Sequence, residues 1–180
     1  MRHLKTEGII IKRRNSGEAD RILTVFTKNS GKILVKAIGV RRIISRRSPH
    51  IELLNYSFLT VYKGRNLPIL TEAQTIDDFS SLKTNLKTIG IAYHLCELID
   101  SLCAENQEQV LVFSLLLQTL INLSEGKDAK QVVYDFEHRL LLELGFSSHI
   151  PLLRTVDTHA AIEGILERRL KTTQLLQHFL

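Results

Sequence analysis

The amino-acid sequence predicts an α+β protein, in which a small five-stranded barrel is followed by an all-helical domain. Three observations lead to this prediction. Short β-branched runs separated by turns recur up to about residue 76, apolar residues then repeat every three to four positions, and the net charge changes sign between the two parts. We therefore expect a barrel domain at residues 1–78 and a helical domain at residues 79–180.

Five segments of the first part have the composition of strands. The turn Asn29-Ser30-Gly31 separates the second segment from the third, and Lys63-Gly64-Arg65-Asn66 separates the fourth from the fifth. A five-stranded meander of this length suggests a small closed barrel, and the oligonucleotide-binding (OB) fold is the natural candidate. The expected strands are Gly8–Lys12, Arg21–Thr27, Lys32–Ile38, Leu54–Tyr62 and Leu67–Gln74.

Helical periodicity begins after Asp78. An amphipathic helix is expected from about Leu82 to Cys103, and an apolar helix from Val110 to Leu123 that Gly126 terminates. Asp128 is expected to cap the next helix, because Gln131 follows three residues later. That helix runs to Leu144, and a last helical stretch over Thr158–Leu180 is expected to break near Lys171-Thr172-Thr173.

The charge distribution indicates an anionic partner for the barrel. Residues 1–75 hold fifteen Lys/Arg against five Asp/Glu, a net charge of +10, whereas residues 76–180 have a net charge of −5. A solvated basic face is the alternative, but ten excess charges repel one another unless a ligand neutralises them. Guanidinium groups suit phosphate oxygens, so we predict nucleic-acid contacts from Arg13, Arg14, Arg21, Lys32, Lys36, Arg41, Arg42, Arg46, Arg47, Lys63 and Arg65.

Aromatic residues could add base stacking to these contacts. Tyr56, Phe58 and Tyr62 lie at alternate positions of the fourth strand, so they share one face. That face could form a stacking platform, but packing inside the barrel or against the helical domain is the stronger expectation.

Catalytic and metal-binding motifs do not occur in the sequence. It lacks a Walker loop, G-x-G-x-x-G, H-E-x-x-H and G-x-S-x-G, so we expect no enzyme activity and no cofactor. His94 and Cys96 lie on different faces of one helix, and Cys96, Asp100 and Cys103 are better explained as two buried thiols beside an acidic residue. No C-x-x-C pair occurs, so we also expect no bound metal. No apolar window is long enough to cross a membrane and no signal peptide is recognisable, which indicates a cytoplasmic protein. With nucleic acid as the partner of the barrel, we expect it to associate with the nucleoid.

Several segments in order resemble one known family. They are Gly17-Glu18-Ala19-Asp20-Arg21 with the strand that follows, Gly31-Lys32, Tyr62-Lys63-Gly64-Arg65, Leu70-Thr71-Glu72-Ala73, Phe136-Glu137 with Arg139-Leu140-Leu141, Leu144-Gly145-Phe146 and Leu170-Lys171-Thr172-Thr173. This set is similar to the RecO family. The resemblance implies an OB-fold barrel, a helical domain and a recombination mediator that binds DNA without catalysing a reaction.

The resemblance also implies partners and contact residues. The expected partners are single- and double-stranded DNA, RecR, the single-strand-binding protein and, indirectly, RecA. The expected activities are strand annealing and loading of the recombinase, and the cations that carry over are Arg13, Arg21, Lys32, Arg41 and Arg46. Many family members have a four-cysteine zinc module after the Leu-Gly-Phe element. Here Ser147–Pro151 follows without a cysteine, so zinc does not carry over.

Two other functions are compatible with the basic barrel. The protein could be an interaction scaffold whose barrel docks acidic protein tails, or an OB-fold protein that binds RNA. Salt-sensitive binding to DNA of any sequence would separate the DNA-binding function from the scaffold, and a preference for RNA would favour the third function.

Overall fold

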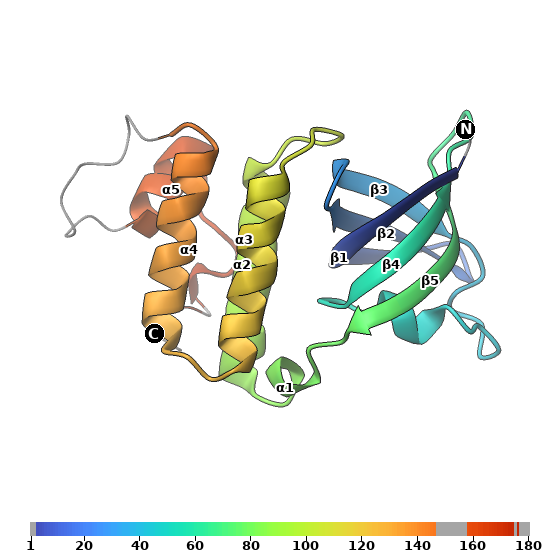
Figure 1. The fold of residues 1–180 in the computed structure, drawn as a ribbon, viewed down its shortest axis with the longest axis horizontal. Helices are drawn as coiled ribbons and strands as arrows, with labels where there is room; N and C mark the ends of the chain where they lie inside the picture. Colours follow the sequence, from blue (N-terminus) through green and yellow to red (C-terminus); the bar gives the residue numbers. More distant parts are fainter. Residues whose placement is uncertain (1–2, 147–157, 175, 177–180) are drawn as a thin grey trace. The chain divides into compact units, whose positions relative to one another are not determined.

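The computed structural model describes residues 3–146, 158–174 and 176 (Figure 1). The chain divides into two compact units, one made of residues 1–79 with 104–110 and the other of residues 80–103 with 111–180. Within the described residues, no helix is both long and apolar enough to span a bilayer.

The first unit is a closed barrel with the strand order β1-β2-β3-β5-β4. The barrel closes because β4 pairs with β1. Every neighbouring pair of strands is antiparallel except β3 and β5, which are parallel. This arrangement confirms the predicted five-stranded OB fold followed by helices. The strands are β1 His3–Ser16, β2 Asp20–Thr27, β3 Gly31–Ala37, β4 Tyr56–Tyr62 and β5 Ile69–Asp77, and a short 3-10 helix η1, Ser48–Ile51, precedes β4.

The barrel core comes from alternate residues of each strand. Ile10, Leu23, Val35, Leu59 and Leu70 are fully buried members of one apolar cluster. A bulge in β1 inserts one extra residue between Ile10 and Lys12, which shifts the alternation along the rest of that strand. The side chains of β1 after the bulge therefore alternate in the opposite phase from those before it.

The segment 104–110 belongs to the barrel unit, although the sequence-based division placed it in the helical part. Glu105 pairs with Lys32 of β3, and the backbone N–H of Asn106 donates to the carbonyl of Lys32 at 2.8 Å. Gly31 lies close to the backbone of Gln107, at a positive φ of 62°. This segment thus extends the β3 edge of the barrel.

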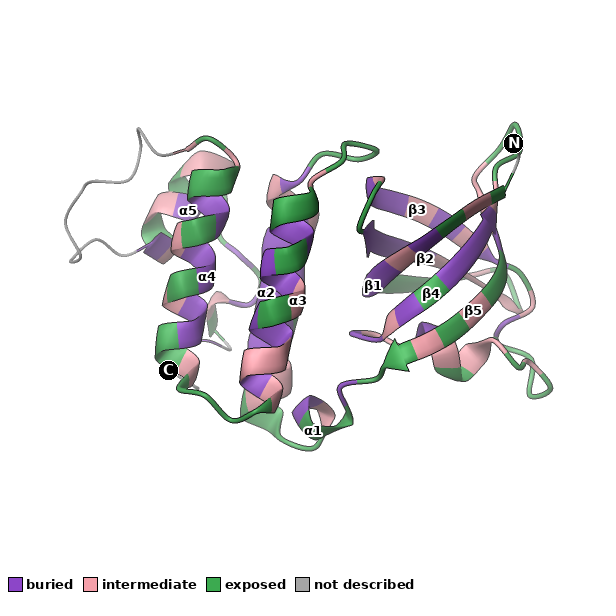
Figure 2. Ribbon diagram, in the orientation of Figure 1, coloured by how far each residue is buried: buried purple, intermediate pink, exposed green. Residues whose placement is uncertain are grey.

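The helical unit contains α1 Ser80–Lys83, α2 Leu86–Leu102, α3 Val110–Ser124, α4 Ala129–Glu143 and α5 Thr158–Leu166. α4 packs against α2 and α5, and Figure 2 shows buried and exposed faces alternating around these helices. The helix expected from Leu82 is divided, because the Asn85 side chain accepts from the N–H of Lys87 and starts α2 afresh. The predicted Asp128 cap is confirmed by its hydrogen bond from the N–H of Gln131, and Gly126 follows α3 at a φ of 79°.

The last expected helix is shorter than predicted. α5 ends at Leu166, and Lys171 and Thr172 form a turn near the expected break. The end of the expected helix, at 175 and 177–180, and the segment Ser147–Pro151 lie outside the described residues. Cys96 and Cys103 are both buried and form no disulfide, as expected.

Candidate nucleic-acid interface

Three connections leave the same end of the barrel. Arg21 at the start of β2 lies opposite Ala37 at the end of β3, and Lys36 lies opposite Ile69 at the start of β5. Ile69 in turn pairs with Tyr62 at the end of β4. The β1–β2 turn (17–19), the loop after β3 (38–47) and the β4–β5 turn (63–68) therefore emerge together, and we call this region the basic end of the barrel. OB folds bind oligonucleotides with the β2–β3 face and the first and last of these connections.

Asp20 organises the loop after β3. Its Oδ1 accepts from the backbone N–H of Gly39 at 2.8 Å, and its Oδ2 pairs with the Lys36 ammonium at 3.0 Å. The Gly39 N–H and Lys36 hold the pKa of Asp20 below its ordinary value. Arg41 adds two bonds from the loop, because its backbone N–H donates to the carbonyl of Ala19 at 2.9 Å and its guanidinium to the carbonyl of Gly17 at 3.0 Å. The β1–β2 turn and the loop are thereby joined.

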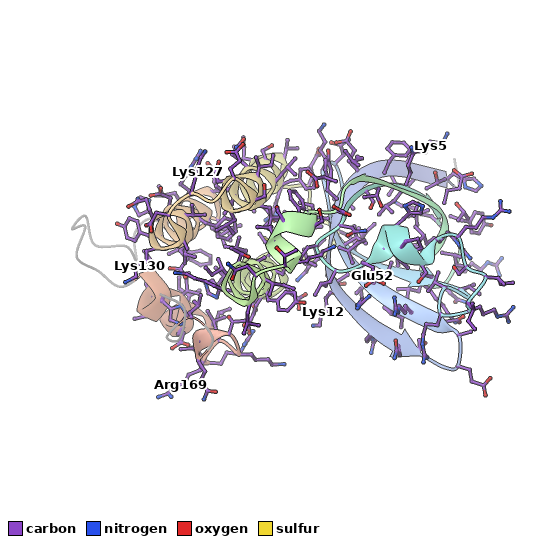
Figure 3. The ribbon with its side chains drawn as sticks, turned by 90° about the horizontal axis from the view of Figure 1, so that it is seen from below. Lys5, Lys12, Glu52, Lys127, Lys130 and Arg169 are labelled. Carbon is purple, nitrogen blue, oxygen red and sulfur yellow. The ribbon has the colours of Figure 1, made fainter. Side chains whose placement is uncertain are left out.

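Glu52 pairs with two of the predicted DNA-binding arginines. The guanidinium groups of Arg13 and Arg21 both donate to its carboxylate, Arg21 at 3.2 Å. Figure 3 shows Glu52 just after the short helix η1, so this pairing connects the β3–β4 connection to β1 and β2. Sequence analysis did not predict it, because Glu52 is 39 residues from Arg13 and 31 from Arg21.

Arg47 and Lys32 also have structural contacts. Arg47 donates to the carbonyl of Leu70 at 2.6 Å and to that of Ile38 at 2.8 Å, which holds the end of the loop against the barrel. Lys32 is only 7% exposed and lies on the strand edge that pairs with residue 105. For these two residues, a structural role competes directly with a role in DNA binding.

The remaining predicted cations are exposed. Their side chains make no hydrogen bond or ion pair with any other described residue, and each lies on the basic end of the barrel or on the adjoining end of β1: Arg14, Arg42, Arg46, Lys63 and Arg65. Arg14 and Lys36 both pair with Ile22, from its two sides, and face outward beside β2. The structure thus brings together five cations whose donors are available to an external anion.

Two isoleucines lie exposed among these cations. Ile43 and Ile44 follow Arg42 and are 105% and 86% exposed, the two highest values among the exposed large apolar side chains of the described chain. Sequence analysis did not single them out, because an Ile-Ile pair resembles a strand or core segment. Contiguous exposed apolar surface marks interaction sites, so these two neighbours are candidate contacts for a partner.

The aromatic residues of β4 lie outside the barrel. Leu59 and Val61 point into the core, so Phe58 and Tyr62 point outward, and Phe58 is 40% exposed. The Tyr56 hydroxyl donates to the Glu7 carboxylate at 2.6 Å, and Tyr62 packs on the His3 ring at a centroid distance of 5.3 Å. Packing inside the barrel, one of the two expected environments, is therefore wrong for this face.

Family models match both parts of the chain. The model described as Recombination protein O N terminal matches residues 1–79, and the one described as Recombination protein O C terminal matches residues 83–150. The chain belongs to the RecO family.

Curated RecO relatives support the same assignment. The chain is 42% identical over 142 residues to the DNA repair protein RecO of Roseiflexus sp. (strain RS-1). This match covers 79% of this chain and 50% of that protein. It is 36% identical over 148 residues to the DNA repair protein RecO of Acetivibrio thermocellus, covering 82% of this chain and 59% of the relative. The chain thus spans between half and three fifths of the length of these two relatives.

The RecO N-terminal match contains all eleven predicted cations. The stretch Gly17–Thr27, on which the resemblance most depends, forms the β1–β2 turn and β2, and its Asp20 carries the loop contacts described above. The similarity to RecO proteins at this stretch therefore coincides with residues that shape the basic end of the barrel.

The helical unit of this RecO protein holds a polar cluster that sequence analysis missed. His94 of α2, Glu137 of α4 and His159 of α5 each offer one ligand-type atom, and these atoms lie within 4.8 Å of one another. His94 is 43 residues from Glu137, so no local spacing could have indicated the cluster. Only the fold brings the three side chains together.

Proposed function

We propose that this protein is a non-enzymatic DNA-binding mediator of recombinational DNA repair. In this proposal the basic end of the barrel binds single- and double-stranded DNA, promotes annealing of complementary strands and supports loading of the recombinase. RecR, the single-strand-binding protein and, indirectly, RecA are the proposed protein partners, and the nucleoid is the proposed location. Membership of the RecO family supports this proposal.

One structural observation carries the DNA-binding part of the proposal. Five exposed cations, whose side chains make no hydrogen bond or ion pair with a described residue, gather around three connections at one barrel end, in a unit whose first 75 residues have a net charge of +10. Phosphate contacts from such residues give affinity without reading base sequence. The exposed Ile43 and Ile44 add apolar side chains that can contact unstacked bases.

The contacts of each loop arginine decide which substitutions best test DNA binding. Arg41 and Arg47 donate to backbone carbonyls of the barrel, so replacing either would also disturb the loop. Arg42 and Arg46 lie in the same loop, and their side chains make no such bonds. The variant Arg42→Ala/Arg46→Ala therefore removes charge with little effect on folding, since exposed substitutions usually change stability by less than ~0.5 kcal/mol.

The experiment measures DNA affinity as a function of salt by fluorescence anisotropy. Each phosphate contact contributes about 0.7 to the slope of log affinity against log salt on single strands and about 0.9 on duplex. We expect the double variant to lower this slope by about one to two units and to weaken binding to all sequences alike.

The matched control is Lys127→Ala/Lys130→Ala, which removes the same charge from exposed positions of the helical unit, labelled in Figure 3. It should keep the wild-type slope. An unchanged slope in Arg42→Ala/Arg46→Ala would contradict the assignment of the loop. Equal losses in both variants would indicate only a general effect of net charge.

A further inference from the structure

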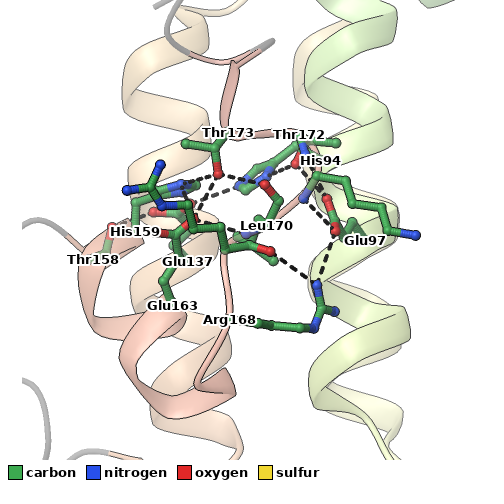
Figure 4. Close-up of polar contacts among 12 residues, drawn as sticks. His94, Glu97, Glu137, Thr158, His159, Glu163, Arg168, Leu170, Thr172 and Thr173 are labelled. Atoms are coloured by element: carbon green, nitrogen blue, oxygen red, sulfur yellow. Dashed lines mark hydrogen bonds and ion pairs between the residues drawn. The ribbon is translucent and has the colours of Figure 1, made fainter.

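His94, Glu137 and His159 form a cluster in the helical unit, and the outer contacts of the two rings indicate which ring nitrogens carry protons. His94 and Glu137 are almost completely buried, at 0% and 3% exposure, and His94 Nε2 lies 2.8 Å from Glu137 Oε1. His159 Nδ1 lies 3.5 Å from the same carboxylate oxygen, and its side chain is 20% exposed. Figure 4 shows the two rings and the carboxylate converging from three helices.

The proton on His94 is fixed by its other neighbour. His94 Nδ1 lies 2.8 Å from the hydroxyl of Thr172, and that hydroxyl donates to Glu97 Oε2 at 2.8 Å. Burial raises the pKa of Glu97, but the N–H groups of Lys171 and Thr172 outweigh this effect and lower it, so the carboxylate only accepts. A hydroxyl has one proton, so the Thr172 oxygen must accept from Nδ1–H of His94. In a neutral ring, Nε2 then presents a lone pair to the Glu137 carboxylate.

The same reasoning applies to His159. Its Nε2 lies 3.1 Å from the hydroxyl of Thr173, whose own proton is directed to Glu163 Oε1 or to the carbonyl of Leu170, each at 2.8 Å. The Leu170 carbonyl only accepts, and Glu163 Oε1, which accepts from the N–H of Leu170 at 2.9 Å, also lies 3.5 Å from His159 Nε2. His159 therefore carries its proton on Nε2. In a neutral ring, Nδ1 presents a second lone pair to Glu137.

With both rings neutral, two imidazole lone pairs and a carboxylate oxygen would face one another in a largely buried site. This arrangement is unfavourable unless a second ring proton or a metal ion places a positive charge among the three atoms. We propose that His94 Nε2, His159 Nδ1 and a Glu137 carboxylate oxygen form a binding site for a divalent transition metal, with Zn²⁺ as the best-fitting ion. The site differs from the sequence-based expectation that no metal is bound.

The surroundings match those of a metal site. Each of the three proposed ligand residues contacts a threonine hydroxyl through its second polar atom, the one that does not face the proposed ion. Thr172 contacts His94 Nδ1, Thr173 contacts His159 Nε2, and Thr158 contacts Glu137 Oε2. Such outer contacts fix the tautomer and orientation of metal-binding histidines.

The distances and ligand set favour zinc. Tetrahedral Zn²⁺ with bonds of about 2.0–2.1 Å separates its ligands by roughly 3.3 Å, between the 2.8 and 3.5 Å found here. Two histidines and one glutamate are also a known zinc ligand set that leaves a fourth position for water.

The test uses the whole 180-residue chain, stripped with a chelator that is then removed. ZnCl₂ is titrated by calorimetry near neutral pH, and Co²⁺ is used as a spectroscopic substitute that reports coordination geometry. We expect one Zn²⁺ per chain and a tetrahedral Co²⁺ spectrum. Thr173→Val, which leaves the ligands in place, should weaken binding by about tenfold, and His159→Gln by more.

The matched control is His138→Gln, because His138 is adjacent to Glu137 on α4 but stacks on Tyr134 instead. It should bind zinc as the wild type does, and circular dichroism should show that all variants are folded. The proposal is overturned if the folded wild type takes up no Zn²⁺, or if His159→Gln binds it equally well. It is also overturned if nitrogen NMR shows that both rings stay doubly protonated after zinc is added.

Discussion

Replacement of Gly31 by alanine tests how the segment 104–110 is held to the barrel. A Cβ at this position would lie 1.8 Å from the carbonyl oxygen of Gln107 and 2.6 Å from its carbonyl carbon, both backbone atoms that cannot move aside alone. The positive φ of 62° costs an alanine roughly 1–2 kcal/mol, and overpacking adds about 1–3 kcal/mol. We therefore expect Gly31→Ala to lower the free energy of unfolding by about 2–5 kcal/mol.

The assay is urea unfolding followed by circular dichroism, with Gly17→Ala as the control. Gly17 has a nearly equal φ of 59°, but a Cβ there would meet nothing within 4 Å. Gly17→Ala should thus show only the backbone cost of roughly 1–2 kcal/mol. Equal losses in the two variants would refute the close approach of Gln107 to the β2–β3 turn.

Three further predictions concern other parts of the chain. Asp20→Asn should increase hydrogen exchange at the Gly39 amide, because the variant loses the carboxylate that accepts from it. The pKa of Asp20 is lowered in the folded protein, so the carboxylate stabilises the fold at pH values above its ordinary pKa and this effect is lost as the pH falls below that pKa. Wild type and variant should therefore converge in acid. Ile43→Ser/Ile44→Ser should weaken single-strand binding by about tenfold with an unchanged salt slope, whereas a changed slope would mean altered phosphate contacts. Burial raises the pKa of Cys96 to about 12, so the native protein should leave this thiol unmodified by iodoacetamide, and rapid native alkylation would contradict its burial.

Much of the barrel could be predicted because its strands follow simple alternation. β2 and β3 begin within one residue of the expected positions, since Leu23, Val25, Ile33 and Val35 alternate with outward residues. β1 was expected only over Gly8–Lys12, because its ends are polar and its bulge breaks the period of two. The sequence also predicts one continuous helix from Leu82, because its apolar residues continue in the same stripe past Asn85. In the structure α1 ends at Lys83, and Asn85 caps a new helix, α2.

The positive charge of the candidate interface could be predicted from the sequence, but the contacts that its cations make within the fold could not. The sequence indicated a basic barrel, and the structure divides its cations between internal contacts and exposed positions. That division depends on Glu52 and Asp20 reaching arginines, lysines and amides far away in the sequence. The histidine–glutamate cluster depends likewise on three helices packing together, which no local pattern encodes.

The central proposal, DNA binding by the basic end of the barrel, is tested most directly by titrating the wild-type protein against matched single-stranded DNA, duplex DNA and RNA at several salt concentrations. We expect binding to single-stranded and duplex DNA of unrelated sequences, with affinity falling linearly on a log–log plot as salt rises. A protein that binds neither DNA, or that binds only RNA or acidic protein tails under the same conditions, would contradict the proposal.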